Sequence, residues 1–535
     1  MPTITIDKED LLKCVGKKLT DETLKDRIPM IGTSLEYIDD DELVVEVFPD
    51  RPDMLAGAGF ARALSAFIGI NPGLRKYEVR KSDFKAKVDP KVKNVRPFVV
   101  AAVAKKVLLN EVTIQYLMQV QEKIHTTFGR NRKKLSIGVY DFDKIKFPLL
   151  YTTKPKDFKF VPLEYNKEMK LSEILSEHPK GVDYAHLLKG MKEYPIWLDA
   201  NNQVLSMPPI INSENTKVSL NTKSLFIDVT GLDLNACEQA LNILISSMAD
   251  RGFEIYSVDV DGKSYPRLEP RKMKVNLDYV NKILGLKLKE NELKPLLEKM
   301  GYGYVNSEVI VPCYRVDILS EIDIIEDIAV AYGYENFKPE ISNFSSIAHE
   351  DEFESFKNKL ANMMVGFGLL ETNTYNLAKK NDQTKNMRLN LSLVEIENAL
   401  NEEYNVLRSW MLPSLLDVFK NNKHHENPQK IFEIGTVFNS EEKSKLGMLI
   451  THSSVTYTEA RQILDSLIAS LGLEVSIKSS EHESFIPGRV GRIIVKGKDV
   501  GVIGEIHPEV LSNFELETPV VGFELDINEL FKLIK

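Results

Sequence analysis

The sequence predicts a multidomain chain of α/β domains followed by a C-terminal α+β domain built on an antiparallel sheet. Its 535 residues are enough for several domains of ordinary size. Strand-like and helix-like segments alternate through the first half, and strands with a few amphipathic helices make up the last third. A proline-rich stretch at residues 263–272 separates two of these regions. We therefore expect four domains, at residues 1–90, 91–265, 266–342 and 343–535.

The composition excludes several classes of protein. Apolar residues make up 43% of the chain, which is ordinary for a folded protein with buried cores. The formal net charge is −9, so any contact with nucleic acid must come from a local patch or from another subunit. The three cysteines are far apart and not in metal-binding spacing, which is typical of reduced thiols in a cytoplasmic protein. We find neither a signal peptide nor an apolar run of about eighteen residues, and so expect no membrane span.

The sequence of residues 1–265 predicts two α/β regions. The first opens with a strand at residues 3–6 and a helix that begins at Asp7. In the second, the strand Phe98–Ala104 is followed by an amphipathic helix at residues 111–127. This helix runs into the most concentrated basic stretch of the chain, Gly129–Lys134. That stretch is either a solvated helix C-terminus, where cations suit the helix dipole, or a contact to a phosphate backbone.

Two segments of the second region could line a polar pocket. Ser206 and Asn212 flank a double proline that restricts the backbone. Asp228 and Thr230 alternate with apolar residues in a strand, so both face the same side of the sheet. Together these side chains offer hydroxyl, amide and carboxylate groups, but they include no pair of nucleophile and base. The alternative interpretation is ordinary turn chemistry beside a capped strand.

The sequence of residues 266–342 predicts a small module of three helices and a strand. Two short helices are each ended by a glycine, Gly285 and Gly301. The apolar run 311–318 then predicts a strand, and Glu321–Tyr332 predicts a helix that ends at Gly333. This order resembles a winged-helix module, a class that includes nucleic-acid-binding domains, although the mixed charge here favours no particular partner.

Four carboxylates converge at the corner between this strand and this helix. We call Asp317, Asp323, Glu326 and Asp327 the acidic corner. The last three lie at i, i+3 and i+4 of the helix, and Asp317 precedes it. Oxygen ligands of this kind suit a hard divalent cation, above all Mg²⁺. The alternative is a solvated acidic face whose first turn is capped at Ser320, and spacing alone favours this alternative.

The motifs taken together resemble the beta subunits of phenylalanyl-tRNA synthetase of the archaeal and eukaryotic cytosolic type. The resemblance covers nearly the whole chain, and the order and spacing of its motifs make it specific. The motifs are Phe-Pro-Asp-Arg-Pro-Asp-Met-Leu at 48–55, Ser-Met-Pro-Pro-Ile-Ile-Asn at 206–212, Val-Pro-Cys-Tyr-Arg-Val-Asp-Ile at 311–318 with the helix to Tyr334, and Phe-Ile-Pro-Gly-Arg at 485–489 with the strand and helix at 501–511.

The resemblance implies an α2β2 enzyme that joins phenylalanine to tRNA-Phe by way of an aminoacyl-adenylate. ATP and phenylalanine are the substrates of the complex, Mg²⁺ is its cofactor, and synthesis takes place on the alpha subunit. Residues 343–535 are then expected to form a class II synthetase fold that lacks the catalytic residues and serves the subunit interface. Arg408 lies near the place of an ATP-binding arginine in such folds, and we expect it to be structural.

The resemblance also implies that residues 91–265 are an editing domain, which hydrolyses tyrosine wrongly attached to tRNA-Phe. The matching positions make Ser206, Asn212, Asp228 and Thr230 the candidates for the editing pocket, with Glu122 behind them and Lys217 as the cation near the tRNA end. Ser213 stands where relatives are expected to have glycine, which makes the backbone of this loop harder to predict.

The acidic corner matches the positions at which this family is expected to hold a Mg²⁺ shared with the alpha subunit. The resemblance therefore favours the metal over the solvated acidic face. The predicted function is that of a ligase beta subunit with an editing site. A subunit that binds tRNA and assists assembly, with an inactive pocket, is one alternative, and a stand-alone metal-dependent hydrolase is another.

Overall fold

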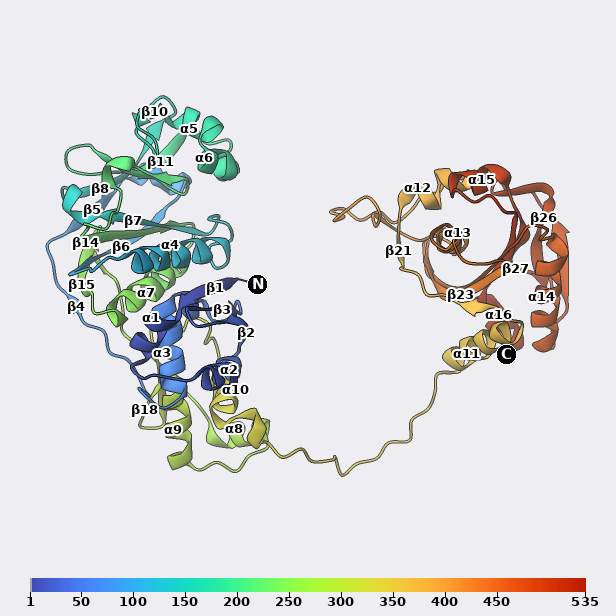
Figure 1. The fold of residues 1–535 in the computed structure, drawn as a ribbon, viewed down its shortest axis with the longest axis horizontal. Coiled ribbons are helices and arrows are strands. Elements are labelled where there is room, and N and C mark those ends of the chain that lie inside the picture. The colour runs from blue at the N-terminus through green and yellow to red at the C-terminus, as the bar shows by residue number, and fades with distance from the viewer. Residues whose placement is uncertain (1) are drawn as a thin grey trace. The chain divides into compact units, whose positions relative to one another are not determined.

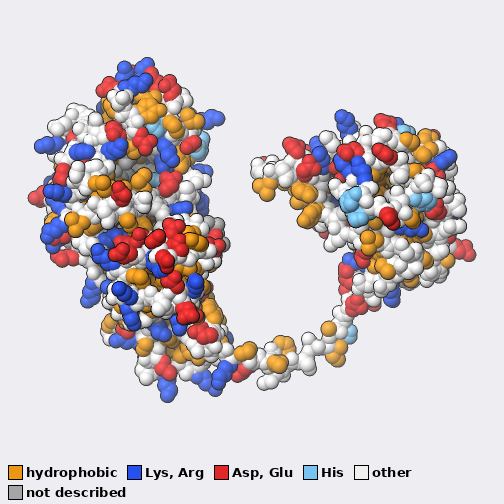
Figure 2. Space-filling model, in the orientation of Figure 1, with side chains coloured by type: hydrophobic (Ala, Val, Ile, Leu, Met, Phe, Trp, Pro, Cys, Tyr) orange, Lys and Arg blue, Asp and Glu red, His pale blue; other side chains and the backbone are white. Residues whose placement is uncertain are grey.

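The computed structural model describes residues 2–535, which form two compact units at residues 2–340 and 341–535 (Figure 1). Acidic and basic side chains are interspersed on the visible surface of each unit (Figure 2), in line with the absence of an overall basic footprint. Among the described residues, no helix has the length and apolar character needed to cross a membrane.

The first unit opens with a small antiparallel sheet of order β1-β3-β2, packed against helices. Asp7 caps the first helix by accepting a hydrogen bond from the Asp10 N–H, as expected of an aspartate at a helix N-terminus. The elements are β1 (Thr3–Asp7), α1 (Lys8–Val15), α2 (Asp21–Met30), β2 (Thr33–Ile38), β3 (Glu42–Val47) and α3 (Gly57–Phe67).

A long central sheet follows, and its strand path runs β13-β12-β11-β8-β5-β15-β6-β14-β7, with β4 and β16 paired to β15. Its strands are β4 (Val79–Arg80), β5 (Lys85–Val88), β6 (Phe98–Lys105), β7 (Leu135–Asp141), β8 (Leu149–Pro155), β11 (Glu193–Leu198), β12 (Val204–Met207), β13 (Ile211–Asn212), β14 (Ser224–Gly231), β15 (Glu254–Val260) and β16 (Lys263–Tyr265). The accompanying elements are α4 (Glu111–Thr126), β9 (Lys159–Phe160), β10 (Met169–Lys170), α5 (Leu171–Glu177), α6 (Pro179–Tyr184) and α7 (Leu234–Asp250).

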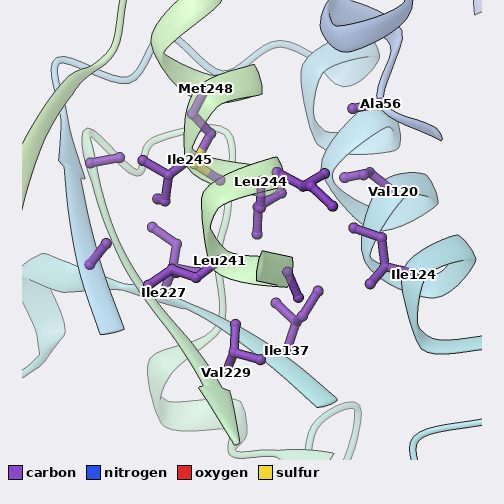
Figure 3. Close-up of a cluster of buried hydrophobic side chains, with 14 of the residues drawn as sticks. Ala56, Val120, Ile124, Ile137, Ile227, Val229, Leu241, Leu244, Ile245 and Met248 are labelled. Atoms are coloured by element: carbon purple, nitrogen blue, oxygen red, sulfur yellow. The ribbon is translucent and has the colours of Figure 1, made fainter. Parts of the chain in front are cut away.

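Helix α7 covers the face formed by β6 and β14 and is the centre of the core. Its apolar residues recur at helical spacing, so they form a continuous stripe. Figure 3 shows Leu241, Leu244 and Ile245 of α7 packed among Ile227 of β14 and Ile124 of α4. The same core continues into the first three helices, so residues 1–67 and the central sheet share one buried interior.

The module at residues 271–332 has a three-stranded antiparallel sheet of order β17-β19-β18 and three helices. Helix α10 spans Glu321–Tyr332, which confirms the predicted helix. The strand predicted at 311–318 is wrong: β19 ends at Val311, and Pro312 begins an irregular segment because proline has no N–H for the ladder. The elements are β17 (Arg271–Lys274), α8 (Leu277–Leu284), α9 (Glu290–Lys299), β18 (Gly303–Val305), β19 (Glu308–Val311) and α10.

The second unit is built on a seven-stranded sheet of order β20-β23-β24-β28-β27-β26-β25, antiparallel except for the pairing of β20 with β23. Helices cover both faces of this sheet: α11, α14 and α16 pack on one face and α13 and α15 on the other. The elements are α11 (Glu352–Gly366), β20 (Leu370–Glu371), β21 (Leu377–Ala378), α12 (Lys380–Gln383), β22 (Val406–Leu407), α13 (Leu412–Asn421), β23 (Gln429–Phe438), β24 (Glu442–Thr451), α14 (Tyr457–Ser470), β25 (Val475–Ser479), β26 (Phe485–Val495), β27 (Lys498–Ile506), α15 (Pro508–Asn513), β28 (Val520–Asp526) and α16 (Ile527–Ile534).

Candidate functional site

The candidate site is a cavity of about 620 Å³ between the two ends of the central sheet. The terminal strands β7 and β13 face each other across it. The Asn212 side-chain amide of β13 donates a hydrogen bond to the Val139 carbonyl of β7 over 3.3 Å. The Arg132 guanidinium, just before β7, donates to the Ile210 carbonyl before β13 over 2.9 Å. The two strand ends are therefore held together although about 70 residues separate them in the chain.

The floor of the cavity is a buried polar cluster contributed by three strands. The Tyr140 hydroxyl of β7 lies 2.6 Å from Asp228 Oδ1 of β14 and 2.7 Å from Ser206 Oγ of β12. All three residues line the cavity, and all three are almost completely buried. Such a cluster is stable only because its polar atoms bond one another. Ser206 and Asp228, predicted from the sequence, thus meet at one point.

Burial raises the pKa of Asp228 to about 6, although the hydrogen bond from Tyr140 favours the ionised form. Burial also raises the pKa of the Tyr140 phenol well above its usual value. At neutral pH the floor therefore holds an ionised carboxylate beside neutral hydroxyl groups, and this carboxylate is a strong acceptor for a hydroxyl that enters the cavity.

Thr230 faces the same side of β14 as Asp228, as predicted, but lies behind the floor and does not line the cavity. Its hydroxyl accepts a hydrogen bond from Arg96 Nε over 3.0 Å and lies 3.1 Å from the Ser136 hydroxyl. Ser136 does line the cavity. Thr230 therefore reaches the site through Ser136, a residue that the sequence did not single out.

Glu122, His125 and Arg132 form one wall of the cavity. Arg132 Nη2 donates to Glu122 Oε2 over 3.1 Å, and His125 Nδ1 lies 3.5 Å from the same oxygen. His125, followed by Arg132, lowers the pKa of Glu122 to about 2. Burial lowers the pKa of His125 to about 4, and its Nε2 accepts from the Ile137 N–H over 2.7 Å. The neutral imidazole therefore carries its proton on Nδ1, toward the glutamate.

The basic stretch after α4 has a third role that the sequence did not suggest. Arg130, Asn131 and Arg132 all have positive φ angles, between 51° and 63°, so the chain turns sharply here. This turn directs Arg132 inward, where it bonds Glu122 and packs over the Tyr184 ring of α6 at 4.3 Å. Arg132 is therefore neither a solvated helix end nor an exposed phosphate contact.

The mouth of the cavity carries the predicted cation Lys217, which is exposed and lies 3.2 Å from Glu214. Lys180 lines the same opening. At the position where glycine was expected, the backbone has an ordinary extended conformation. Ser213 has φ −86° and ψ 145°, which any residue can adopt. Its hydroxyl donates to the Val161 carbonyl over 3.2 Å and so fixes the loop.

The acidic corner lies in the module and is organised around Arg315. Arg315 Nη2 lies 2.7 Å from Asp317 Oδ2 and 2.6 Å from Asp327 Oδ2, and Tyr302 also donates to Asp327. Asp323 instead accepts from the N–H groups of residues 319 and 320, each over 2.7 Å, which closes the first turn of α10.

These contacts do not fit a single cation shared by the four carboxylates. Two of the four are bonded to one guanidinium and a third serves the helix N-terminus. Within residues 2–535, no group of three or more His, Cys, Asp or Glu side chains is arranged to hold a metal ion. The magnesium site stays a prediction, and the chemistry of the cavity does not depend on it.

In the second unit, Arg408 is buried and bonded to three neighbours. It lies 2.7 Å from Glu433, donates to the Thr436 carbonyl over 2.8 Å and donates to the Thr374 hydroxyl over 2.8 Å. A guanidinium held inside the core by three partners through Nε and Nη1 agrees with the structural role expected of Arg408.

Three domain families match the chain. The B3/4 domain family matches residues 83–259, which contain the cavity, and the tRNA synthetase B5 domain family matches residues 273–334, which contain the acidic corner. The family described as the phenylalanyl tRNA synthetase beta chain CLM domain matches residues 341–527.

Whole-chain relatives lead to the same family. The chain is 41% identical to a phenylalanine–tRNA ligase beta subunit of Pyrococcus abyssi, over 99% of this chain and 100% of the relative. It is also 41% identical to one from Archaeoglobus fulgidus, over 99% of each. A crystal structure of an N-terminal fragment of the phenylalanyl-tRNA synthetase beta subunit from Pyrococcus horikoshii is 40% identical, with a TM-score of 0.60, and covers 62% of this chain and 100% of the fragment. The chain therefore belongs to the family of phenylalanine–tRNA ligase beta subunits.

Proposed function

We propose that this chain hydrolyses the ester that joins tyrosine to tRNA-Phe, as the beta subunit of a phenylalanine–tRNA ligase. An alpha subunit attaches phenylalanine with the use of ATP, and two copies of each subunit form the enzyme. The observation that carries the proposal is the contact between Ser206, Tyr140 and Asp228 at the floor of the cavity.

Fidelity explains why a second site is needed. A pocket that accepts phenylalanine cannot strongly reject an analogue with one added hydroxyl, so tyrosine is attached at a low rate. A hydrolytic site with a polar floor selects in the opposite sense. Tyrosine supplies a hydroxyl to the buried Asp228, whereas phenylalanine leaves that carboxylate without a partner and so binds poorly.

The shape of the cavity suits this ligand. Its walls include apolar side chains such as Ile114, Leu117 and Ile210, which can cover an aromatic ring. Its polar groups lie at the floor and along one wall. A tyrosyl group with its hydroxyl at the floor places its ester toward the mouth, near Lys217, which attracts the phosphates of the tRNA end.

The chemistry requires one water molecule. Water adds to the ester carbonyl, the bond from the acyl carbon to the ribose oxygen breaks, and the products are free tyrosine and tRNA with its ribose hydroxyl restored. Glu122 is ionised at neutral pH because its pKa is about 2, and it is suited to hold the water or the substrate's amino group. Asn212 on the opposite side and Thr230, through Ser136, complete the polar surroundings.

The rest of the chain supports the proposal that the alpha subunit carries out synthesis and this chain carries out editing. The second unit engages Arg408 with Glu433, which agrees with a class II fold without its own catalytic site. The three helices and three-stranded sheet at 271–332 suit a winged-helix-like module. The acidic corner gives no support to a stand-alone metal-dependent hydrolase, since two of its carboxylates already bond Arg315.

The test is to purify this chain with its alpha subunit and to assay charging and deacylation separately. We expect the complex to deacylate Tyr-tRNA-Phe much faster than Phe-tRNA-Phe. Asp228→Ala should slow deacylation of Tyr-tRNA-Phe and leave formation of Phe-tRNA-Phe intact. If the variant deacylates the mischarged tRNA at the wild-type rate, the assignment of Asp228 is wrong. If the wild-type complex does not deacylate it, the chain is an assembly and tRNA-binding subunit with an inactive pocket.

A further inference from the structure

The side chain of Tyr140 connects the two substrate-facing groups of the cavity floor. Its hydroxyl is within 2.7 Å of both Ser206 Oγ and Asp228 Oδ1. Its ring is held by stacking on Phe226 at 5.7 Å and 28°, and 1% of the residue is exposed. A hydroxyl on so rigid a ring has one position, so the two groups that it bonds are fixed relative to each other.

Strand register explains how Tyr140 reaches Asp228. Asp228 of β14 is directly opposite Gly138 of β7, and Tyr140 is two residues further on the same face. Such a diagonal pair is within reach of a long aromatic side chain. Gly138 makes the approach possible, because a Cβ there would lie 2.1 Å from the Tyr140 hydroxyl and 2.4 Å from Asp228 Oδ1. The hydroxyl thus occupies the space that a side chain at 138 would take.

We infer that Tyr140 is a positioning residue for editing: it holds Asp228 through Oδ1 so that the second carboxylate oxygen accepts the hydroxyl of a bound tyrosyl group. Ser206, bonded to the same phenol, is held beside it. This inference rests on the function proposed above and adds to it the element that sets the orientation and the ionisation of the selecting carboxylate.

The surroundings of Asp228 show why the Tyr140 hydroxyl has a large effect on the pKa of this carboxyl group. The other groups that interact with it are Trp197 on β11, Tyr151 on β8, Arg96 before β6 and the thiol of Cys237 on α7. Burial raises the pKa of Asp228, and the hydrogen bond from Tyr140 is the strongest of the effects that lower it. Removing that hydroxyl therefore favours the protonated carboxyl, which is a poorer acceptor for the substrate.

The variant Tyr140→Phe tests this, because it keeps the ring and its stacking and removes one oxygen. In the α–β complex we expect kcat/KM for Tyr-tRNA-Phe deacylation at pH 7 to fall about tenfold, which is the effect of losing one charge-assisted hydrogen bond. The rise of activity with pH should also shift upward by about one pH unit. Tyr302→Phe is the matched control, since it removes a buried phenol that donates to Asp327, away from the cavity, and should change neither quantity.

The results that test the role of Tyr140 can be told apart from the results that test the proposed function. Deacylation by the wild-type complex and its loss in Asp228→Ala support the function, whatever Tyr140→Phe does. A Tyr140→Phe complex with the wild-type rate, or with a lower rate and an unchanged pH profile, overturns the positioning role. If Tyr140→Phe does not fold, Gly138→Ala replaces it: the added methyl displaces the hydroxyl from Asp228 and should produce the same upward shift. A wild-type complex without deacylation overturns both proposals.

Discussion

Arg315 Nη2 lies 2.6 Å from Asp327 Oδ2, in the interior of the first unit and between β19 and α10. The same nitrogen lies 2.7 Å from Asp317, so one buried guanidinium bonds two carboxylates of the acidic corner. Buried charges are stable only as complete groups, because removing one member leaves the others without compensation.

We therefore expect Arg315→Met to destabilise the first unit by about 3–5 kcal/mol. Lys272→Met, which breaks an exposed ion pair with Glu308 in the same module, should cost less than about 1 kcal/mol. The chain has two tryptophans, one in each unit, so Trp410→Phe leaves Trp197 as the only reporter of the first unit. Urea unfolding of both variants in that background measures the difference. Equal losses would show that Arg315 is not a central ion-pair residue.

The same arrangement makes a prediction about Mg²⁺. Because Arg315 and the first turn of α10 already engage three of the four carboxylates, adding Mg²⁺ or a chelator should leave the melting temperature of the isolated chain unchanged. A ligand that binds only the folded state raises stability in proportion to RT ln(1 + [L]/Kd). A rise of several degrees with Mg²⁺, lost in Asp323→Asn, would restore the metal site that the sequence suggested.

Asp228 makes the stability of the first unit depend on pH. Its pKa in the folded chain is about 6, above the ordinary value of 3.8, so the folded state holds the proton more tightly than the unfolded state does. The contribution of Asp228 to stability is therefore greatest below pH 3.8 and is lost as the pH rises through about 6. Asp228→Asn, which cannot ionise, should gain about 2 kcal/mol relative to wild type between pH 4 and pH 7. The Trp197 fluorescence transition at the two pH values is the measurement, and a constant difference would contradict the raised pKa.

His125 acts in the opposite direction over nearly the same range. Its pKa is lowered from 6.5 to about 4, because burial disfavours the imidazolium and Nε2 must stay unprotonated to accept from the Ile137 N–H. The unfolded state then binds more protons between pH 6.5 and pH 4, so stability falls by about 3 kcal/mol as the pH falls through this window. His125→Gln keeps an acceptor and removes the titration. Its stability relative to wild type should rise on acidification, and parallel pH curves would contradict this.

In the second unit, the buried pair of Arg408 and Glu433 predicts that Arg408→Met costs about 3–5 kcal/mol. Arg492→Met, which breaks an exposed pair with Asp499, should cost less than about 1 kcal/mol. In a Trp197→Phe background, Trp410 reports this unit. Deacylation should be unchanged in Arg408→Met complexes that assemble, since the cavity lies in the other unit. Loss of deacylation in a folded, assembled variant would contradict that separation.

Local sequence signals predicted much of the fold and part of the site. The helix Glu321–Tyr332 was predictable because its cap, its apolar stripe and its terminal glycine agree. Asp228 and Thr230 were correctly placed on one face because strand side chains alternate. The strand expected at 311–318 failed because apolar residues there pack without joining a ladder once Pro312 has removed a donor.

The rest of the site depends on contacts between distant parts of the chain. Tyr140 touches Ser206, 66 residues away, only because the central sheet brings β7 and β12 together. Arg132 lies in a run of basic residues, and only the three positive φ angles there direct it inward. Thr230 was placed on the correct face, but its role depends on Arg96, which comes from a different segment and bonds its hydroxyl from behind. Neither composition nor spacing carries this information.

Arg132 also bears on the course of the proposed editing reaction. It bonds Glu122 of α4, bonds the Ile210 carbonyl before β13, and packs on Tyr184 of α6, so one side chain ties together three elements around the cavity. A cavity whose surrounding elements are tied together in this way keeps its shape without a moving cover. We therefore expect the arrival and departure of the tRNA 3′ end, rather than a rearrangement of the protein, to limit the rate of the proposed editing reaction.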